Sequence, residues 1–214
     1  MKLLRRTILA LALLYGLLIV IAHWPVETTP IEKLAGPDSR FITLNGTSLH
    51  YTKWGAGPPL VLVHGYGGST YTWRELIPLL KDRHSVYALD LLGFGLTAKP
   101  PEGDYSMPAQ AGLVIDFLKA MNLPQATLVG HSMGGIIVAY AAIQAPELVD
   151  RLVIVEGGFY HGGAPAFLKY LFFPLERLMA KMFYTPTGRS KSLMASYYNK
   201  EIVTDAVLEA NLAP

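Results

Sequence analysis

The sequence predicts an α/β protein with a mostly parallel, doubly wound sheet, and three observations support this fold class. Between residues 59 and 157, short apolar runs alternate with stretches whose apolar residues have helical spacing. Glycine-rich turns follow two of the apolar runs, at residues 65–68 and 130–135. The chain has 214 residues, 51% of them hydrophobic, which is enough for one domain with a substantial core.

The predicted elements begin with a β-hairpin, because residues 40–55 form two extended runs around the turn dipeptide Asn45-Gly46. Strands are then expected at 59–65, 85–90, 126–130 and 151–157, and helices at 70–82, 106–122 and 133–145. Ser106 is the expected N-cap of the second of these helices. Strands that alternate with helices predict parallel βαβ units, so both faces of the sheet should be covered.

The sequence changes character on either side of this region. After Gly158, residues 159–214 have helical patterns without intervening strands and are rich in Phe, Tyr, Leu and Met. Residues 25–39, which contain several Pro, Thr and charged residues, are interpreted as a linker. We therefore expect the core of the domain at 40–158, between the linker and a helical C-terminal segment.

Residues 1–24 are expected to lie outside the globular core, because residues 7–22 carry no charge and Lys2, Arg5 and Arg6 precede them. A bilayer span needs about 17–25 apolar residues, and the apolar region of a signal peptide needs about 7–15. The segment therefore predicts either a membrane anchor over residues 7–24 or a cleaved signal followed by a secreted protein. Because basic flanks stay in the cytoplasm, the rest of the chain is expected outside it, in the periplasm or the extracellular space.

Composition excludes several classes of function. The net charge is only +2 and no block of Lys and Arg marks one face, so no nucleic-acid partner is expected. The chain has no cysteine, which excludes disulfides, thiolate catalysis and Cys-ligated zinc. No His and carboxylate residues show metal-ligand spacing, so we expect neither a metal nor a cofactor.

The segment ATLVGHSMGGIIVAYAA, residues 126–142, carries the strongest functional signal. It places Ser132 where an apolar strand ends and an apolar helix begins, as a nucleophile elbow requires. The small residues Gly130, Gly134 and Gly135 allow the two backbones to approach, while His131 is expected to pack beside the serine. The alternative interpretation is a glycine-rich turn in which the serine only caps the helix.

A second segment, VHGYGG at residues 63–68, directly follows an earlier strand. An oxyanion hole needs two N–H donors that converge on one point. The N–H of Met133 is one candidate, and the N–H of Tyr66 is the other, since Gly65 and its neighbouring glycines let the loop turn inward. His64 is expected to hold the shape of this loop by hydrogen bonding. An ordinary β-to-α turn is the alternative.

Together, these segments resemble the α/β-hydrolase superfamily. The resemblance rests on the Asn45-Gly46 hairpin and on residues 64–67, 90–95 and 130–135, in the family's order. It implies an eight-stranded sheet, Ser132 as nucleophile, Met133 and Tyr66 as oxyanion donors, and a helical cap, or lid, at 159–214. A serine at position 132 is similar to the lipase and carboxylesterase branch, and it argues against dehalogenase and epoxide-hydrolase relatives, which have Asp there.

The base and the acid that should activate Ser132 are not evident. The family order is Ser, then Asp or Glu, then His. His161 is the one histidine after Ser132, but it opens the cap rather than following the last strand. Glu156 ends a strand at the correct edge and is a candidate acid in a variant arrangement, whereas Asp90 is expected to be structural. We therefore expect the base and acid beyond residue 214, so that the chain is an N-terminal part of a longer hydrolase whose last visible strand has an open edge.

These observations predict a serine hydrolase of carboxylic esters, with an apolar ester as its small-molecule substrate because the cap is rich in aromatic and aliphatic residues. Two other reactions of the same fold stay open, namely C–C bond hydrolysis and cofactor-free haloperoxidase chemistry. A truncated, non-catalytic hydrolase is a further alternative.

Overall fold

The computed structural model describes residues 2–25, 29–157, 174–175, 177–178, 181 and 185–212. The chain forms two compact units. One unit contains Pro30–His161 with Ala213–Pro214, and the other contains Met1–Thr29 with Gly162–Leu212.

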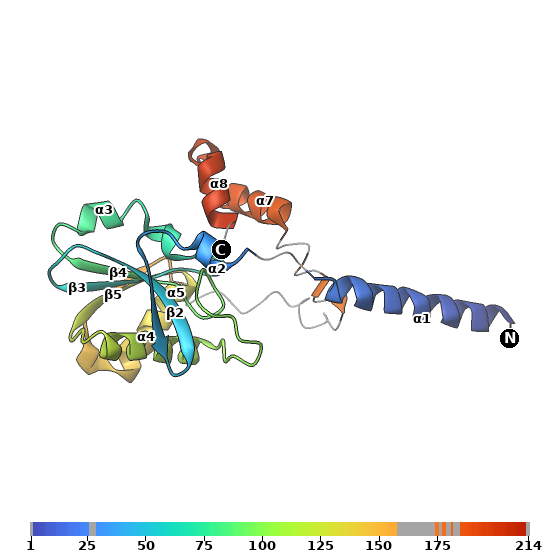
Figure 1. Ribbon diagram of the computed structural model, residues 1–214, viewed down its shortest axis with the longest axis horizontal. Coiled ribbons are helices and arrows are strands. Elements are labelled where there is room, and N and C mark those ends of the chain that lie inside the picture. Colours follow the sequence, from blue (N-terminus) through green and yellow to red (C-terminus); the bar gives the residue numbers. More distant parts are fainter. Residues whose placement is uncertain are drawn as a thin grey trace. The chain divides into compact units, whose positions relative to one another are not determined.

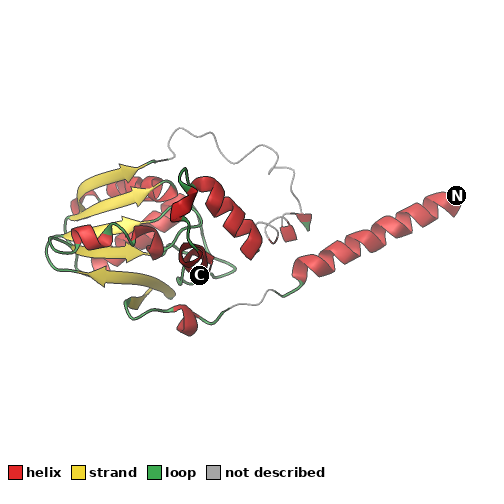
Figure 2. Cartoon of the chain, turned by 90° about the horizontal axis from the view of Figure 1, so that it is seen from above, coloured by secondary structure: helices red, strands yellow, loops and turns green. Residues whose placement is uncertain are grey.

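The first unit is built on a six-stranded sheet with the order β1-β2-β4-β3-β5-β6 (Figures 1 and 2). The strands are β1 (Ser39–Leu44), β2 (Thr47–Trp54), β3 (Pro59–Val63), β4 (Ser85–Leu89), β5 (Ala126–His131) and β6 (Val149–Val155). β1, β2 and β4 pair in antiparallel fashion, whereas β4, β3, β5 and β6 are parallel. The predicted α/β class with a mostly parallel sheet is confirmed. The resemblance implied eight strands, and the described residues form six of them.

Helices cover both faces of this sheet. On one face, α4 (Met107–Ala120) and α5 (Met133–Gln144) pack together with β3, β4 and β5 in a core that includes Val61, Leu89, Phe117, Leu128 and Ile137. On the other face, a 3₁₀ turn, η1 (Thr70–Trp73), and the short helix α3 (Ile77–Leu80) cover a smaller core. Figure 1 shows α3 and α4 on opposite sides of the strands.

The predicted hairpin is confirmed at β1 and β2. Asn45 and Gly46 have φ values of 49° and 80°, the left-handed conformation that a two-residue turn of this kind requires. Leu44 pairs with Thr47 directly across the turn. The Asn45 Nδ2 group donates a hydrogen bond of 2.7 Å to Asp116 Oδ2 on α4, which ties the hairpin to that helix.

The helix predicted at 70–82 is not continuous, because the structure has η1, a turn and α3 in its place. The apolar spacing identified the buried residues correctly, since Trp73 and Ile77 are both buried. The break has a local cause. Pro78 has no N–H group to donate to the carbonyl of Arg74, so an α-helix cannot run through this point without losing a hydrogen bond.

The other helix boundaries of this unit agree with the sequence more closely. α4 begins after Ser106, whose hydroxyl accepts a hydrogen bond of 3.4 Å from the Ala109 N–H, as predicted for an N-cap. Part of the segment 25–39, which was interpreted as a linker, has regular secondary structure. Residues Ile31–Leu34 form the short helix α2, and Ser39 already belongs to β1.

β6 is an open edge in the part of the chain that the structure describes. It pairs with β5 on one side, and Leu152, Val153, Ile154 and Val155 are each between 39% and 44% exposed. Consecutive strand residues point to opposite faces, so both faces of β6 are partly uncovered. The central strand β3 differs, since Val61, Leu62 and Val63 are fully buried. The predicted open apolar edge is therefore present in the described residues.

The second unit contains α1 (Lys2–His23), α7 (Pro186–Ser196), the 3₁₀ turn η4 (Lys200–Ile202) and α8 (Asp205–Leu212). The described residues between 174 and 212 include helices and turns but no strand, in agreement with the predicted helical segment. Residues 158–173 lie outside the described residues. The boundaries proposed for the anchor, linker, core and cap stay predictions.

Within the described residues, α1 is the helix that is long and apolar enough to cross a membrane. The candidate span, Arg5–His23, has 19 residues, and only 6% of its apolar window is buried within the structure. Signal sequences have similar length and composition, so both interpretations of the N-terminus remain open.

Candidate active site

Ser132 occupies a strained junction between β5 and α5. Its φ and ψ are 51° and −117°, a conformation that costs a non-glycine residue about 1–3 kcal/mol. The Ser132 N–H donates to the Val155 carbonyl at 2.9 Å, and the Ser132 carbonyl accepts from the Gly135 N–H at 2.9 Å. The side chain makes no capping hydrogen bond to the helix. The turn therefore has the geometry of a nucleophile elbow and lacks the contact that a capping serine would make.

Glycines on either side allow this turn to pack tightly. A Cβ atom on Gly130 would collide with the backbone of Gly134, and a Cβ on Gly134 would collide with the backbone carbonyls of Val63 and His64. Any side chain at these two positions would push α5 away from β5 and β3. A Cβ on Gly135 would be 3.0 Å from Ile154 Cγ2, which is also tight. Packing therefore requires small residues at these positions.

The loop after β3 lies directly against Ser132. A Cβ built on Gly65 would be 3.1 Å from Ser132 Cβ and 2.9 Å from His131 Nδ1, so the loop backbone and the elbow are in contact. The loop is closed by a hydrogen bond of 3.1 Å from the Gly68 N–H to the Gly65 carbonyl. The two predicted donors flank this contact, because Tyr66 follows Gly65 and Met133 follows Ser132 in the sequence.

His64 is a buried, neutral imidazole that holds the loop at residues 65–68 in place. Its ring is fully buried, and Nε2 accepts a hydrogen bond of 3.0 Å from the Leu91 N–H. Because an N–H group can only donate, the ring proton is on Nδ1, which donates to the Gly65 carbonyl at 2.7 Å. Burial lowers the pKa of His64 below its ordinary value, although the Asp90 carboxylate opposes this shift. This geometry agrees with a supporting role for His64.

An aromatic row connects this support to the surface. The Phe94 ring packs edge-on against His64 and also against Tyr66, with centroid distances of 5.6 Å in both cases. Tyr66 is 71% exposed within the described residues. The surface beside the elbow is therefore apolar and aromatic. Sequence reasoning missed Phe94, although it lies in the 90–95 segment that carried the family resemblance.

Asp90 acts as a buried hydrogen-bond acceptor at the end of β4. Its carboxylate accepts from His50 Nδ1 at 2.7 Å and from the backbone N–H groups of Thr70 and Leu96 at 2.6 and 2.8 Å. His50 Nε2 lies 2.9 Å from Ser39 Oγ on β1. These bonds connect β1, β2 and β4 to the segment that follows the loop, in agreement with the structural role expected for Asp90. The pairing of His50 with Asp90 was not predicted.

Of the two remaining triad candidates, Glu156 and His161, the structure describes only Glu156. Glu156 directly follows β6 in a left-handed conformation, with φ of 53°, and its Oε2 is 3.6 Å from His131 Nε2. The Glu156 side chain is 86% exposed, and an ion pair this open contributes little to stability. His161 lies outside the described residues. Among those that are described, no histidine bonds Ser132 Oγ, and no group of His and carboxylate side chains has the arrangement of a metal site.

The sequence profile described as the alpha/beta hydrolase fold matches residues 58–186. The chain belongs to the α/β-hydrolase family. This α/β hydrolase is 39% identical over 129 residues to an uncharacterised protein of Mycobacterium tuberculosis, covering 60% of this chain and 38% of that protein. It is 33% identical over 176 residues to an uncharacterised hydrolase of Bacillus subtilis, covering 81% of this chain and 64% of the relative. The chain thus spans less than two thirds of the length of these relatives.

Relatives with named activities differ in the substrate class for which they are named. The hydrolase is 38% identical over 120 residues to 2-hydroxy-6-oxo-6-(2'-aminophenyl)hexa-2,4-dienoic acid hydrolase of Metapseudomonas resinovorans, covering 54% of this chain and 41% of the relative. It is also 36% identical over 113 residues to a soluble epoxide hydrolase of a Corynebacterium species, covering 53% of this chain and 39% of the relative. Overall similarity therefore supports a hydrolase without separating these reactions, although Ser132 had argued against an epoxide-hydrolase relative.

Two solved structures show the same fold. Cfl2 of Burkholderia cenocepacia is similar with a TM-score of 0.71 and 27% identity, over 88% of this chain and 69% of that protein. A membrane phospholipase A described as a bacterial virulence factor has a TM-score of 0.66 and 25% identity, over 99% of this chain and 69% of that protein.

Proposed function

We propose that this chain carries the nucleophile and the oxyanion hole of a membrane-associated serine hydrolase that cleaves carboxylic esters. The observation that supports the proposal most directly is the strained Ser132, which lies against the Gly65 loop and makes no capping bond. Strain of this kind is characteristic of functional positions, and it is maintained here by tight packing on both sides.

In the proposed reaction, Ser132 Oγ attacks the ester carbonyl carbon while a base removes the hydroxyl proton. The N–H groups of Met133 and Tyr66 stabilise the oxyanion that forms, and the first turn of α5 adds its positive partial charge. The C–O bond to the alcohol then breaks, and the base returns the proton to the departing alkoxide. Water attacks the acyl-enzyme in the same way, which releases the carboxylic acid and restores Ser132.

The base and the orienting acid are assigned, as part of this proposal, to sequence beyond residue 214. The chain spans between 38% and 64% of the length of the first relatives, so room for these groups exists in proteins of this kind. Glu156 and His161 are the alternatives within the chain. Sequencing the DNA after codon 214 distinguishes the cases, because an open reading frame with a further strand, an acid and a later histidine is expected.

We place the enzyme at a membrane, with α1 as a retained anchor and the hydrolase unit on the non-cytoplasmic side. The apolar length of α1 supports this location, as does the likeness of nearly the whole chain to a solved membrane phospholipase A. Hydrolysis of a C–C bond is the second candidate, since a relative is named for hydrolysing a hexadienoic acid.

The decisive experiment compares Ser132→Ala with Ser48→Ala in the native protein, including any sequence encoded after codon 214. Ser48 is an exposed serine on β2 and serves as the matched control. With p-nitrophenyl esters, Ser132→Ala should lower turnover by several orders of magnitude, whereas Ser48→Ala should leave it unchanged. Turnover of Ser132→Ala within tenfold of the parent would remove Ser132 from the mechanism. If the parent protein cleaves a C–C bond in a dienoic acid substrate but cleaves no ester, C–C bond hydrolysis would be favoured instead.

A further inference from the structure

The N-terminal helix is not isolated from the rest of the chain. α1 shares one compact unit with residues that follow Gly162, including α7 and α8. The contact is specific at one point. Lys181 Nζ donates hydrogen bonds to the carbonyls of Ile21, at 2.9 Å, and Trp24, at 2.5 Å. The last carbonyls of a helix carry negative partial charge, and the Ile21 carbonyl also accepts a hydrogen bond of 3.2 Å from the Trp24 N–H, so the Lys181 ammonium group adds a cationic cap to the C-terminal end of α1.

This end of α1 has a defined depth if the helix spans a bilayer. The 19 residues of Arg5–His23 are about 28 Å long at 1.5 Å per residue, close to the roughly 30 Å of the hydrocarbon core. Trp24 then lies at the level of the lipid headgroups, where tryptophan is enriched. A side chain bonded to the carbonyls of Ile21 and Trp24 must lie at the same level.

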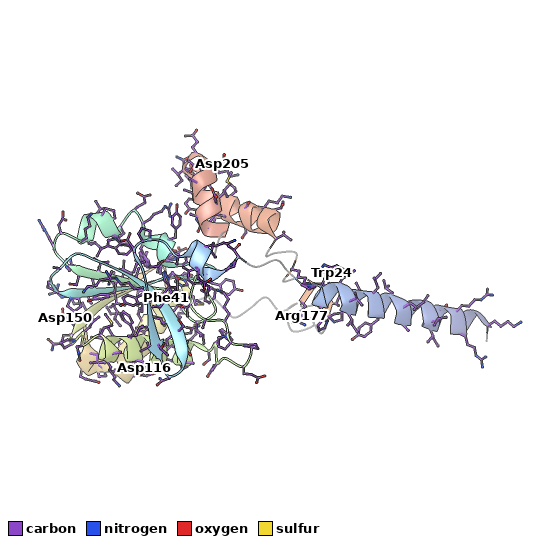
Figure 3. The ribbon with its side chains drawn as sticks, viewed as in Figure 1. Trp24, Phe41, Asp116, Asp150, Arg177 and Asp205 are labelled. Atoms are coloured by element: carbon purple, nitrogen blue, oxygen red, sulfur yellow. The ribbon has the colours of Figure 1, made fainter. Side chains whose placement is uncertain are left out.

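A second cation lies close to this point. Arg177 precedes Lys181 by four residues, and in the view of Figure 3 it is drawn near Trp24 at the end of α1. The Arg177 side chain is exposed. Cationic side chains at the headgroup level are attracted to anionic lipids.

We propose that Arg177 and Lys181 rest on the bilayer surface at the C-terminal end of α1, and that the hydrolase takes an acyl-ester lipid directly from the bilayer. The partner is thus a phospholipid surface, and the substrate is an ester that resides in it. The proposal rests on the proposed ester hydrolysis and narrows it from apolar esters in general to esters presented by a membrane. Both residues belong to the segment predicted to be the cap, residues 159–214.

The absence of cysteine allows the placement to be measured directly in the native protein. Lys181→Cys is labelled with an environment-sensitive fluorophore, and the protein is reconstituted in vesicles of phosphatidylcholine and phosphatidylglycerol. A headgroup-labelled nitroxide lipid should quench this fluorophore strongly. Lys81→Cys, an exposed lysine of the sheet-containing unit, is the matched control and should be quenched less. Equal quenching at the two sites, or none at position 181, would overturn the placement, as would a mature protein that begins near His23.

A second measurement tests the contact itself. In the double variant Trp24→Cys with Lys181→Cys, a short bis-maleimide should join the two residues, whereas Trp24→Cys with Lys81→Cys should not react in this way. Failure to join positions 24 and 181 would show that Lys181 does not cap α1.

Measuring hydrolysis of a vesicle lipid and of a soluble ester distinguishes a failure of this proposal from a failure of the proposed function. Lys181→Glu reverses one charge and should lower hydrolysis of an acyl-ester lipid in the same vesicles by about fivefold to thirtyfold. Hydrolysis of soluble p-nitrophenyl acetate should be unchanged, and Lys181→Arg should restore the vesicle activity. If the parent cleaves the soluble ester but Lys181→Glu cleaves the vesicle lipid normally, the membrane inference fails while ester hydrolysis stands. If the parent cleaves neither ester, the proposed function fails.

Discussion

Gly134 and Gly112 provide a matched pair of glycine-to-alanine substitutions, each within a helix of the sheet-containing unit. In an open helical site, Gly→Ala stabilises by about 1 kcal/mol, because alanine has the higher helix propensity. Gly112 on α4 is such a site, since a Cβ there meets no atom within 4 Å. Gly134 on α5 differs, because its Cβ would collide with two carbonyl groups at the end of β3.

The expected free-energy changes therefore have opposite signs. The collision at Gly134 involves backbone atoms of a fully buried strand, which cannot rotate away, and overpacking of this kind costs about 1–3 kcal/mol or more. Because the added Cβ would be 2.5 Å or less from each of the two carbonyl oxygens, the upper part of this range applies, and after the gain in propensity Gly134→Ala should still destabilise by about 1–2 kcal/mol. For a chain of this size, 1 kcal/mol corresponds to roughly 2–4 °C in the midpoint of thermal unfolding. Gly112→Ala should raise the midpoint by a few degrees, and Gly134→Ala should lower it by a similar or larger amount.

Thermal unfolding followed by circular dichroism, together with ester turnover, tests both variants. Gly134→Ala should also reduce turnover, because the displaced helix begins directly after Ser132. Gly112→Ala should leave turnover unchanged. The packing argument would be refuted by a Gly134→Ala protein that is as stable as Gly112→Ala, since the close approach of α5 to β3 would then not exist.

Three further outcomes are expected. Because burial lowers the pKa of His64 in the folded state, the unfolded chain binds the proton more readily. This group should therefore reduce the free energy of unfolding as the pH falls below about 6.5. In urea unfolding, a His64→Gln variant should show a weaker loss of stability at acid pH. Glu156→Gln should leave the thermal midpoint within about a degree, because its ion pair with His131 is exposed, and turnover within about tenfold; a larger loss of turnover would identify Glu156 as the catalytic acid. After a carbonate wash the protein should remain in the membrane pellet, and external protease should reach the hydrolase unit; a soluble protein that begins near His23 would establish cleavage instead.

The parts of the fold that were predicted from sequence are those set by local chemistry. The Asn45-Gly46 turn needs two residues in the left-handed conformation, and that dipeptide provides them at low cost. The helix at 70–82 shows the limit of apolar spacing. Trp73 and Ile77 were identified as buried, but spacing reports which side chains face the core and not whether the backbone hydrogen bonds continue past Pro78.

The contacts of His50 could not be read from the sequence for a different reason. His50 and Asp90 are forty residues apart, and their contact requires β2 to lie beside β4 rather than beside β3, which follows it in the chain. No local pattern carries that strand order. The site was easier to predict from the sequence, because Ser132 and its glycines are contiguous. The loop at 64–68 follows a strand that parallel pairing places next to β5. The base and acid of the proposed mechanism stay predictions.

The strain at Ser132 allows a last test, which separates a catalytic serine from a serine that merely occupies a turn. At φ of 51° and ψ of −117°, glycine is the residue that adopts the backbone without penalty, whereas alanine carries the same strain as serine. Ser132→Gly should therefore stabilise the protein by about 1 kcal/mol or more relative to Ser132→Ala, after allowing for the greater entropy of glycine in the unfolded chain. Both variants should lose ester turnover by several orders of magnitude, because neither has a hydroxyl group. A Ser132→Gly variant that is both more stable and inactive is expected where a fold maintains strain for function. Equal stability of the two variants would show that the junction is relaxed, and retained turnover in either would show that the nucleophile lies elsewhere.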